Sequence, residues 1–72
     1  MKTTAFNFND FKNGKTAING LGQKVSFICE TRGKMMVRTY TRFGKFTDDK
    51  YTMDGKKYEG STSVYDIVGL VA

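Results

Sequence analysis

The chain has 72 residues and a formal net charge of +5, from twelve Lys and Arg against seven Asp and Glu, with one cysteine and no histidine, tryptophan or proline. This length is that of one small domain, so residues 1–72 are expected to form a single β-rich domain. One cysteine excludes an intrachain disulfide, and the lack of histidine removes the commonest general base and a usual zinc ligand. We therefore expect no catalytic residues, no metal site and no cofactor, so that the protein is not an enzyme.

The first predicted element is a short strand at residues 6–8, where two phenylalanines alternate with an asparagine. A single helical turn over residues 10–13 is expected next. Asn9 or Asp10 would cap this turn, and Gly14 would end it in a left-handed conformation. No apolar signal-peptide core precedes these residues, and we expect a cytoplasmic protein.

Glycines then recur at every eleventh position, each followed closely by a lysine: Gly22, Gly33, Gly44 and Gly55. The stretches between them are rich in Val, Thr, Phe, Tyr and Met, which suit strands. A short strand and its turn take about 8–12 residues, so the spacing predicts an antiparallel meander with a glycine at each corner. An earlier strand at residues 16–18 is expected to turn at Asn19-Gly20.

The central hairpin is the clearest of these units. If residues 31–33 form a three-residue loop, Phe27 lies opposite Val37 and Cys29 lies opposite Met35. Cys29 is then a buried, unreactive thiol on the apolar face. The other face carries Ser26, Ile28, Met36, Arg38, Tyr40 and Arg42.

The last predicted corner is Asp54-Gly55, read as a two-residue turn that pairs Tyr51 with Tyr58 and Lys50 with Glu59. The corner at Phe43-Gly44 is compatible with either a two-residue or a three-residue loop. Residues 64–71 are apolar enough to return as a closing strand that covers a sheet edge. The expected fold is all-β, with at most one short helical turn. It is a twisted antiparallel meander of five or six strands, either closed as an SH3-like barrel or packed under the N-terminal segment.

Charge is concentrated in the central hairpin, because residues 24–45 carry six cations and only one acidic residue, Glu30. Cations alternating with aromatic rings suit a protein interface, since Arg and Tyr are favoured there, and they also suit a single-stranded nucleic acid. A third interpretation is a solvated face, in which Arg38 pairs with Asp48 or Asp49. The candidate binding residues are Lys34, Arg38, Tyr40, Arg42, Phe43 and Lys45.

Four short motifs follow one another along the chain: residues 10–15 (DFKNGK), 22–25 (GQKV), 51–56 (YTMDGK) and 63–68 (SVYDIV). Together they resemble a diffuse group of small bacteriophage and prophage accessory proteins. The resemblance implies a non-enzymatic protein of the host-cell cytoplasm that binds a host or phage protein and inhibits or modulates it. The alternatives are a nonspecific nucleic-acid-binding protein and a homo-oligomeric structural component. No membrane association is expected.

Overall fold

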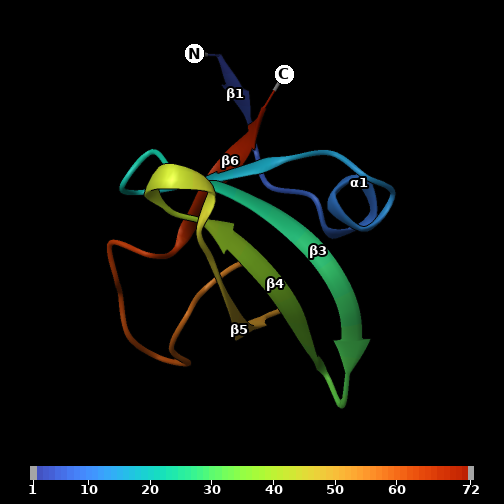
Figure 1. Cartoon of the computed structure of the whole chain (residues 1–72). Helices are drawn as coiled ribbons and strands as arrows, with labels where there is room; N and C mark the ends of the chain where they lie inside the picture. Colours follow the sequence, from blue (N-terminus) through green and yellow to red (C-terminus); the bar gives the residue numbers. More distant parts are fainter. Residues whose placement is uncertain (1, 72) are drawn as a thin grey trace.

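The computed structural model describes residues 2–71, which form one six-stranded antiparallel sheet, a short helix and one turn of 3-10 helix. The elements are β1 (Thr3–Thr4), α1 (Phe8–Lys12), β2 (Ala17–Asn19), β3 (Lys24–Thr31), β4 (Lys34–Tyr40), η1 (Arg42–Gly44), β5 (Phe46–Thr52) and β6 (Ile67–Val71). The order across the sheet is β1-β6-β2-β3-β4-β5 (Figure 1). The predicted all-β antiparallel fold with a single short helix is confirmed.

The sheet does not close into a barrel, so the SH3-like alternative is wrong. Strands β1 and β5 stand at opposite ends of the strand order, and β1 has only two residues with which to pair. The C-terminal strand β6 returns as expected and covers the β2 edge of the meander, and β1 then pairs with its other side. Gly69 makes this position possible, because a Cβ atom there would lie 2.6 Å from the carbonyl oxygen of Thr4.

The eleven-residue glycine spacing does mark corners of the chain. All four glycines have positive φ angles, from 73° at Gly44 to 89° at Gly55. Such angles are strained for residues that carry a Cβ atom, which explains the choice of glycine at these turns. The spacing therefore predicted the sites of chain reversal correctly.

The helix begins earlier than expected, and the predicted strand at residues 6–8 is absent. Asn7 is extended and accepts a hydrogen bond from the Asp10 amide at 3.1 Å, so Asn7 rather than Asn9 or Asp10 is the N-cap. The helix ends before Gly14, whose φ of 114° matches the predicted positive-φ terminator. One turn of helix turns Phe11 into the core, where its ring lies 5.9 Å from that of Phe27 on β3. Aromatic packing thus overrides the alternating pattern of residues 6–8.

The central hairpin has the predicted register only at the end away from its turn. Phe27 lies opposite Val37 as expected, but Cys29 pairs with Met36 instead of Met35, because the register shifts between Phe27 and Cys29. Such an irregularity moves the following side chains to the other face of the strand. Cys29 is therefore exposed, and the expectation of a buried thiol is wrong. The turn has two residues, Arg32 and Gly33, both with positive φ, and not three.

The hairpin predicted at Asp54-Gly55 does not form. A turn is present, since the Thr52 amide donates to the Lys56 carbonyl at 2.8 Å, but no strand follows it. The pairs Tyr51–Tyr58 and Lys50–Glu59 are therefore wrong. Residues 53–66 instead form an irregular segment held by the Asp66 carboxylate, which accepts from the amides of Lys57 (2.9 Å) and Ser63 (3.0 Å). An acidic side chain that satisfies two loop amides replaces the ladder of a strand.

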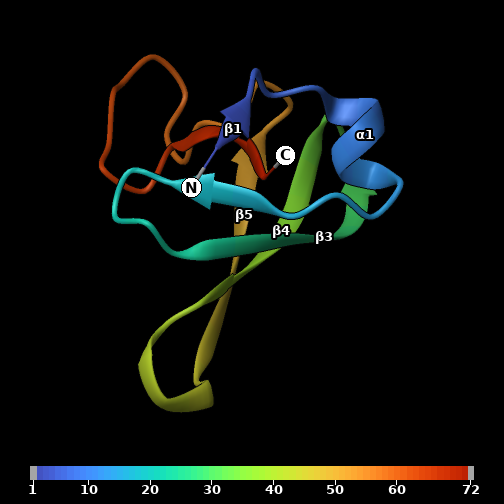
Figure 2. The ribbon, with the colours of Figure 1, turned by 90° about the horizontal axis from the view of Figure 1, so that it is seen from above.

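The core lies on the inner face of the sheet and is closed by α1. Its buried residues are Phe11, Ala17, Val25, Met35, Val37, Tyr51, Ile67 and Leu70. Half-buried rings at Phe6, Phe8 and Phe27 pack around Phe11. The core thus occupies one end of the β4–β5 pair, and the other end extends past it (Figure 2).

Candidate functional site

The β4–β5 ribbon, comprising residues 34–52, carries all six of the predicted binding residues. Its strands pair without interruption from Lys34 opposite Thr52 to Tyr40 opposite Phe46. A register without a bulge keeps even-numbered side chains of both strands on the outer face. Arg38 and Tyr40 therefore lie opposite Asp48 and Phe46 of β5, of which only Asp48 was expected as a neighbour.

On the outer face, Arg38 is bound within the molecule. Its guanidinium makes two hydrogen bonds to the Asp48 carboxylate, at 2.9 Å from Nε and 3.2 Å from the second nitrogen. Its central carbon also lies 4.0 Å from the centroid of the Phe46 ring. The hydrogen bond from Arg38 lowers the pKa of Asp48, and the same bond raises the pKa of Arg38. The charge of Arg38 is thus matched locally, as the solvated-face interpretation predicted for Asp48 or Asp49.

The tip of the ribbon, residues 41–45, differs from the outer face in its charge, because it carries two cations and no acidic residue. The Thr41 amide donates to the Lys45 carbonyl at 2.8 Å, which leaves a three-residue loop over η1 and resolves the corner that the sequence left open. Phe43 occupies the middle of this loop in a left-handed conformation, with φ 60° and ψ 38°, and its side chain is 94% exposed. Arg42 and Lys45 flank it, and the tip contains no acidic residue. Figure 2 shows that η1 stands clear of the rest of the sheet.

The structure gathers five of the six predicted residues toward one end of the ribbon. Tyr40 lies at the base of the tip, with its ring 6.5 Å from that of Phe46. Lys34 lies at the opposite end of β4, next to the turn at Arg32-Gly33. At about 3.4 Å per residue, the seven-residue strand separates Lys34 from Tyr40 by about 20 Å. Lys34 therefore does not share a site with the tip.

A groove runs beside the tip, between the ribbon and the loop that joins β2 to β3. Its volume is about 500 Å³, and it is lined by Leu21, Gly22, Gln23, Lys24, Tyr40, Thr41 and Arg42. The loop wall is held by the buried side chain of Asn19. Its oxygen accepts hydrogen bonds from the backbone N–H groups of Leu21 and Gln23, and its nitrogen donates one to the side-chain oxygen of Gln23. Lys24 and Arg42 give the groove a positive rim.

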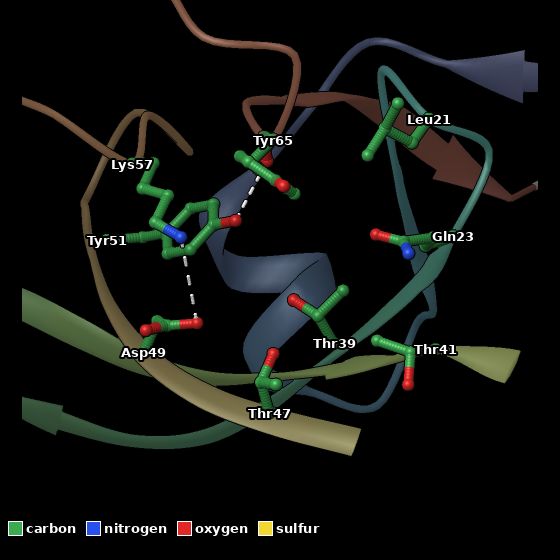
Figure 3. A pocket seen from close by; sticks show the side chains of 9 residues that line it. All are labelled: Leu21, Gln23, Thr39, Thr41, Thr47, Asp49, Tyr51, Lys57 and Tyr65. Carbon is green, nitrogen blue, oxygen red and sulfur yellow. Dashed lines mark hydrogen bonds and ion pairs between the residues drawn. The ribbon is translucent and has the colours of Figure 1, made fainter. Parts of the chain in front are cut away.

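A second hollow lies on the inner face of the ribbon, under residues 57 and 65. Its volume is about 340 Å³, and it is lined by Leu21, Gln23, Thr39, Thr41, Thr47, Asp49, Tyr51, Lys57 and Tyr65 (Figure 3). Burial raises the pKa of the Tyr51 phenol, which donates a hydrogen bond to the Tyr65 carbonyl at 2.8 Å. These residues were not predicted as a site, although the odd-numbered polar positions from Thr39 to Asp49 interrupt an otherwise apolar face.

Across residues 2–71, no group of three or more acidic or cysteine side chains is placed to hold a metal ion. No helix in this described part of the chain is long and apolar enough to span a membrane.

Comparisons with protein-family models, with curated proteins and with solved structures found no match to this chain.

Proposed function

We propose that this is a non-enzymatic binding protein that docks on a partner protein through the tip of the β4–β5 ribbon. The observation that carries the proposal is Phe43, a large apolar side chain that is 94% exposed and is held at a positive φ. A residue other than glycine is strained in the left-handed region, and such strained residues are concentrated at functional sites. An exposed ring at the end of a projecting hairpin suits insertion into a pocket of a partner.

The charges around Phe43 indicate the chemistry of the partner surface. Arg42 and Lys45 flank the ring, and Lys24 lies across the adjacent groove from Arg42. Opposite charges on a partner would speed association and set its orientation. The fitting surface is therefore an apolar pocket with an acidic rim.

Four of the six predicted binding residues belong to the proposed contact. Arg42, Phe43 and Lys45 form the contact, and Tyr40 supports it from the groove. Arg38 positions Phe46 and stays paired with Asp48, so its charge contributes less to binding than its place in the sequence suggested. A paired guanidinium also favours a protein partner over a nucleic acid, because fewer free cations remain to follow a phosphate backbone.

The resemblance to phage accessory proteins supports a role as a cytoplasmic inhibitor or modulator of a host or phage protein. It supplies no identity for the partner. The proposal therefore rests on the geometry of the tip, and its test starts from the tip.

A photo-crosslinking amino acid at position 43 tests the contact in a bacterial lysate. We expect crosslinked products with a small set of proteins, and we expect them to disappear when Arg42→Glu and Lys45→Glu are added. The matched control places the same crosslinker at position 32, in the turn at the other end of the ribbon, which also has a positive φ. Equal products from positions 32 and 43 would show that the tip is not a specific contact.

A single-stranded nucleic acid is the second candidate, because a free ring between two cations also fits base stacking. Fluorescence anisotropy with single- and double-stranded oligonucleotides, at low and moderate salt, separates the two functions. We expect no binding that depends on Phe43. Binding that is lost in Phe43→Ser and falls steeply with salt would replace the protein partner with a nucleic acid.

A further inference from the structure

The hollow under the inner face of the ribbon has the size of a small-molecule site. Its volume of about 340 Å³ lies near the lower end of the range of ligand pockets, about 300–1,000 Å³. Its walls come from four separate parts of the chain: the β2–β3 loop, β4, β5 and the 53–66 segment. Figure 3 shows the hydroxyls of Thr39 and Thr47 and the amide of Gln23 directed toward its middle, whereas the Thr41 hydroxyl points away.

Thr39 is the unusual member of this lining. Its side chain is only 4% exposed, and its hydroxyl oxygen has no hydrogen-bond partner in the described structure. The Thr39 hydroxyl lies near the Tyr51 phenol and partly opposes the rise in the pKa of that phenol. The two groups do not meet the geometry of a hydrogen bond. Buried hydroxyls in proteins nearly always have a partner. The oxygen itself is covered, so a ligand in the hollow would become its partner after a small rotation of the Thr39 side chain.

The charges of the hollow balance each other. The Lys57 ammonium lies 4.0 Å from the Asp49 carboxylate, at the limit of an ion pair, and 4.4 Å from the Tyr65 ring centroid. Within residues 2–71, this contact with Lys57 is the closest interaction of the Asp49 carboxylate, which accepts no hydrogen bond. An anion or a cation in the hollow would meet a like charge as well as an opposite one. The lining therefore fits a neutral ligand whose hydroxyls donate to Asp49 and accept from Lys57.

One wall is apolar. Tyr65 is 40% exposed and Leu21 is 51% exposed, and both line the hollow across from the threonines. A sugar ring has the matching pair of surfaces, with hydroxyls around its edge and C–H groups on its face. Threonine hydroxyls both donate and accept, as sugar hydroxyls do.

We infer that this hollow binds a neutral ligand with a vicinal diol, seated against Tyr65 and bonded to Thr39 and Asp49. The diol belongs either to a free or glycosidic monosaccharide or to the ribose of a nucleoside. This site is separate from the tip and does not depend on the proposed docking function.

Ligand-observed NMR with the intact protein tests the inference directly. The probes are methyl α-glucoside, methyl α-mannoside, methyl β-galactoside, adenosine and 2′-deoxyadenosine, each at up to about 10 mM to reach millimolar affinities. We expect saturation transfer to at least one glycoside or to adenosine, and none to 2′-deoxyadenosine, which lacks the diol. Glycoside binding assigns a sugar ligand, and binding of adenosine alone assigns a ribonucleoside. No binding of any probe, or equal binding of the deoxynucleoside, would overturn the inference.

Two variants locate the bound probe. Thr39→Val keeps the shape of the side chain and removes only the unpartnered hydroxyl, so it should fold at least as well as the wild type. It should weaken binding by about tenfold, as should Asp49→Asn, since each removes a hydrogen bond to the ligand. The matched control is Asp48→Asn, which neutralises the neighbouring residue on the opposite face and should bind as the wild type does. Unchanged binding by both Thr39→Val and Asp49→Asn would place the ligand elsewhere and refute the site.

Discussion

The two ends of the β4–β5 ribbon are built on different principles. At the end near the core, the inward side chains are Met35, Val37 and Tyr51, all no more than 1% exposed. Beside and beyond them the inner face carries Asp49 and three threonines, and the ribbon finishes in an exposed phenylalanine. One continuous hairpin thus passes from a region held by packing to a region held by turn hydrogen bonds and one surface ion pair.

This difference separates stability from binding along a single element. Apolar burial is the main source of folding free energy, so changes at the core end should unfold the protein. The tip buries almost nothing, so changes there should leave folding nearly intact while removing the proposed contacts.

The largest expected effect is at the core end. Met35→Ala should lower the free energy of unfolding by about 2–5 kcal/mol, because it leaves a cavity beneath β4. Phe43→Ala at the tip should change it by no more than about 0.5 kcal/mol. Urea denaturation followed by circular dichroism measures both, with Met35→Leu as the volume-conserving control. Similar losses at the two positions would show that the tip is part of the folding core.

A smaller effect of opposite sign is expected from the backbone of Phe43. Asn adopts left-handed angles more readily than other residues with a side chain, so Phe43→Asn should raise the free energy of unfolding by about 1 kcal/mol. The same variant should lose the crosslinked or captured partner, because the ring is gone. A gain in stability together with a loss of binding would identify Phe43 as a strained functional residue. A loss of stability would indicate that the ring supports the fold.

Turns and strand faces could be predicted from the sequence because they depend on local chemistry. Glycine tolerates positive φ, so its spacing located the corners, and the alternation around Val37 fixed the inner face of β4. The β3 register shift could not be predicted, since it has no distinctive residue. It alone accounts for the wrong placement of Cys29.

The candidate sites depended on longer-range contacts. The partner of Arg38 was limited to Asp48 or Asp49, and the choice between them required the loop length at η1. The hollow required the 53–66 segment, whose path is set by Asp66 and by the Tyr51–Tyr65 hydrogen bond. The sequence pattern there suggested a hairpin, because Asp54-Gly55 is a strong local turn signal. The turn forms, but tertiary contacts of the following segment replace the expected strand.

The ion pair between Arg38 and Asp48 should stabilise the fold only at pH values at which Asp48 is ionised. Because the Arg38 hydrogen bond lowers the pKa of folded Asp48 below its ordinary 3.8, the stabilisation is complete above pH 3.8 and is lost as the pH falls through the folded value. Asp48→Asn should therefore lower the unfolding midpoint at pH 7 but have little effect near pH 2. The difference at pH 7 should shrink in 1 M salt, since the pair is exposed and is screened. A difference that does not depend on pH would mean that Asp48 acts by packing.

The phenol of Tyr51 gives the finest test, because it reports on the boundary between the two ends of the ribbon. Burial raises its pKa above the ordinary value of 10.0, so its share of the stability is complete below pH 10.0 and is lost as the pH rises through the folded value. Ultraviolet titration of tyrosine ionisation should show a transition above pH 10 that is missing in Tyr51→Phe. The Phe variant also loses the hydrogen bond to the Tyr65 carbonyl, a loss of about 1 kcal/mol. Thr39→Val should move this transition to still higher pH, because the Thr39 hydroxyl partly opposes the rise in pKa that burial causes. An unshifted, ordinary transition for Tyr51 in the wild type would mean that the 53–66 segment opens freely and that the hollow is not a formed pocket.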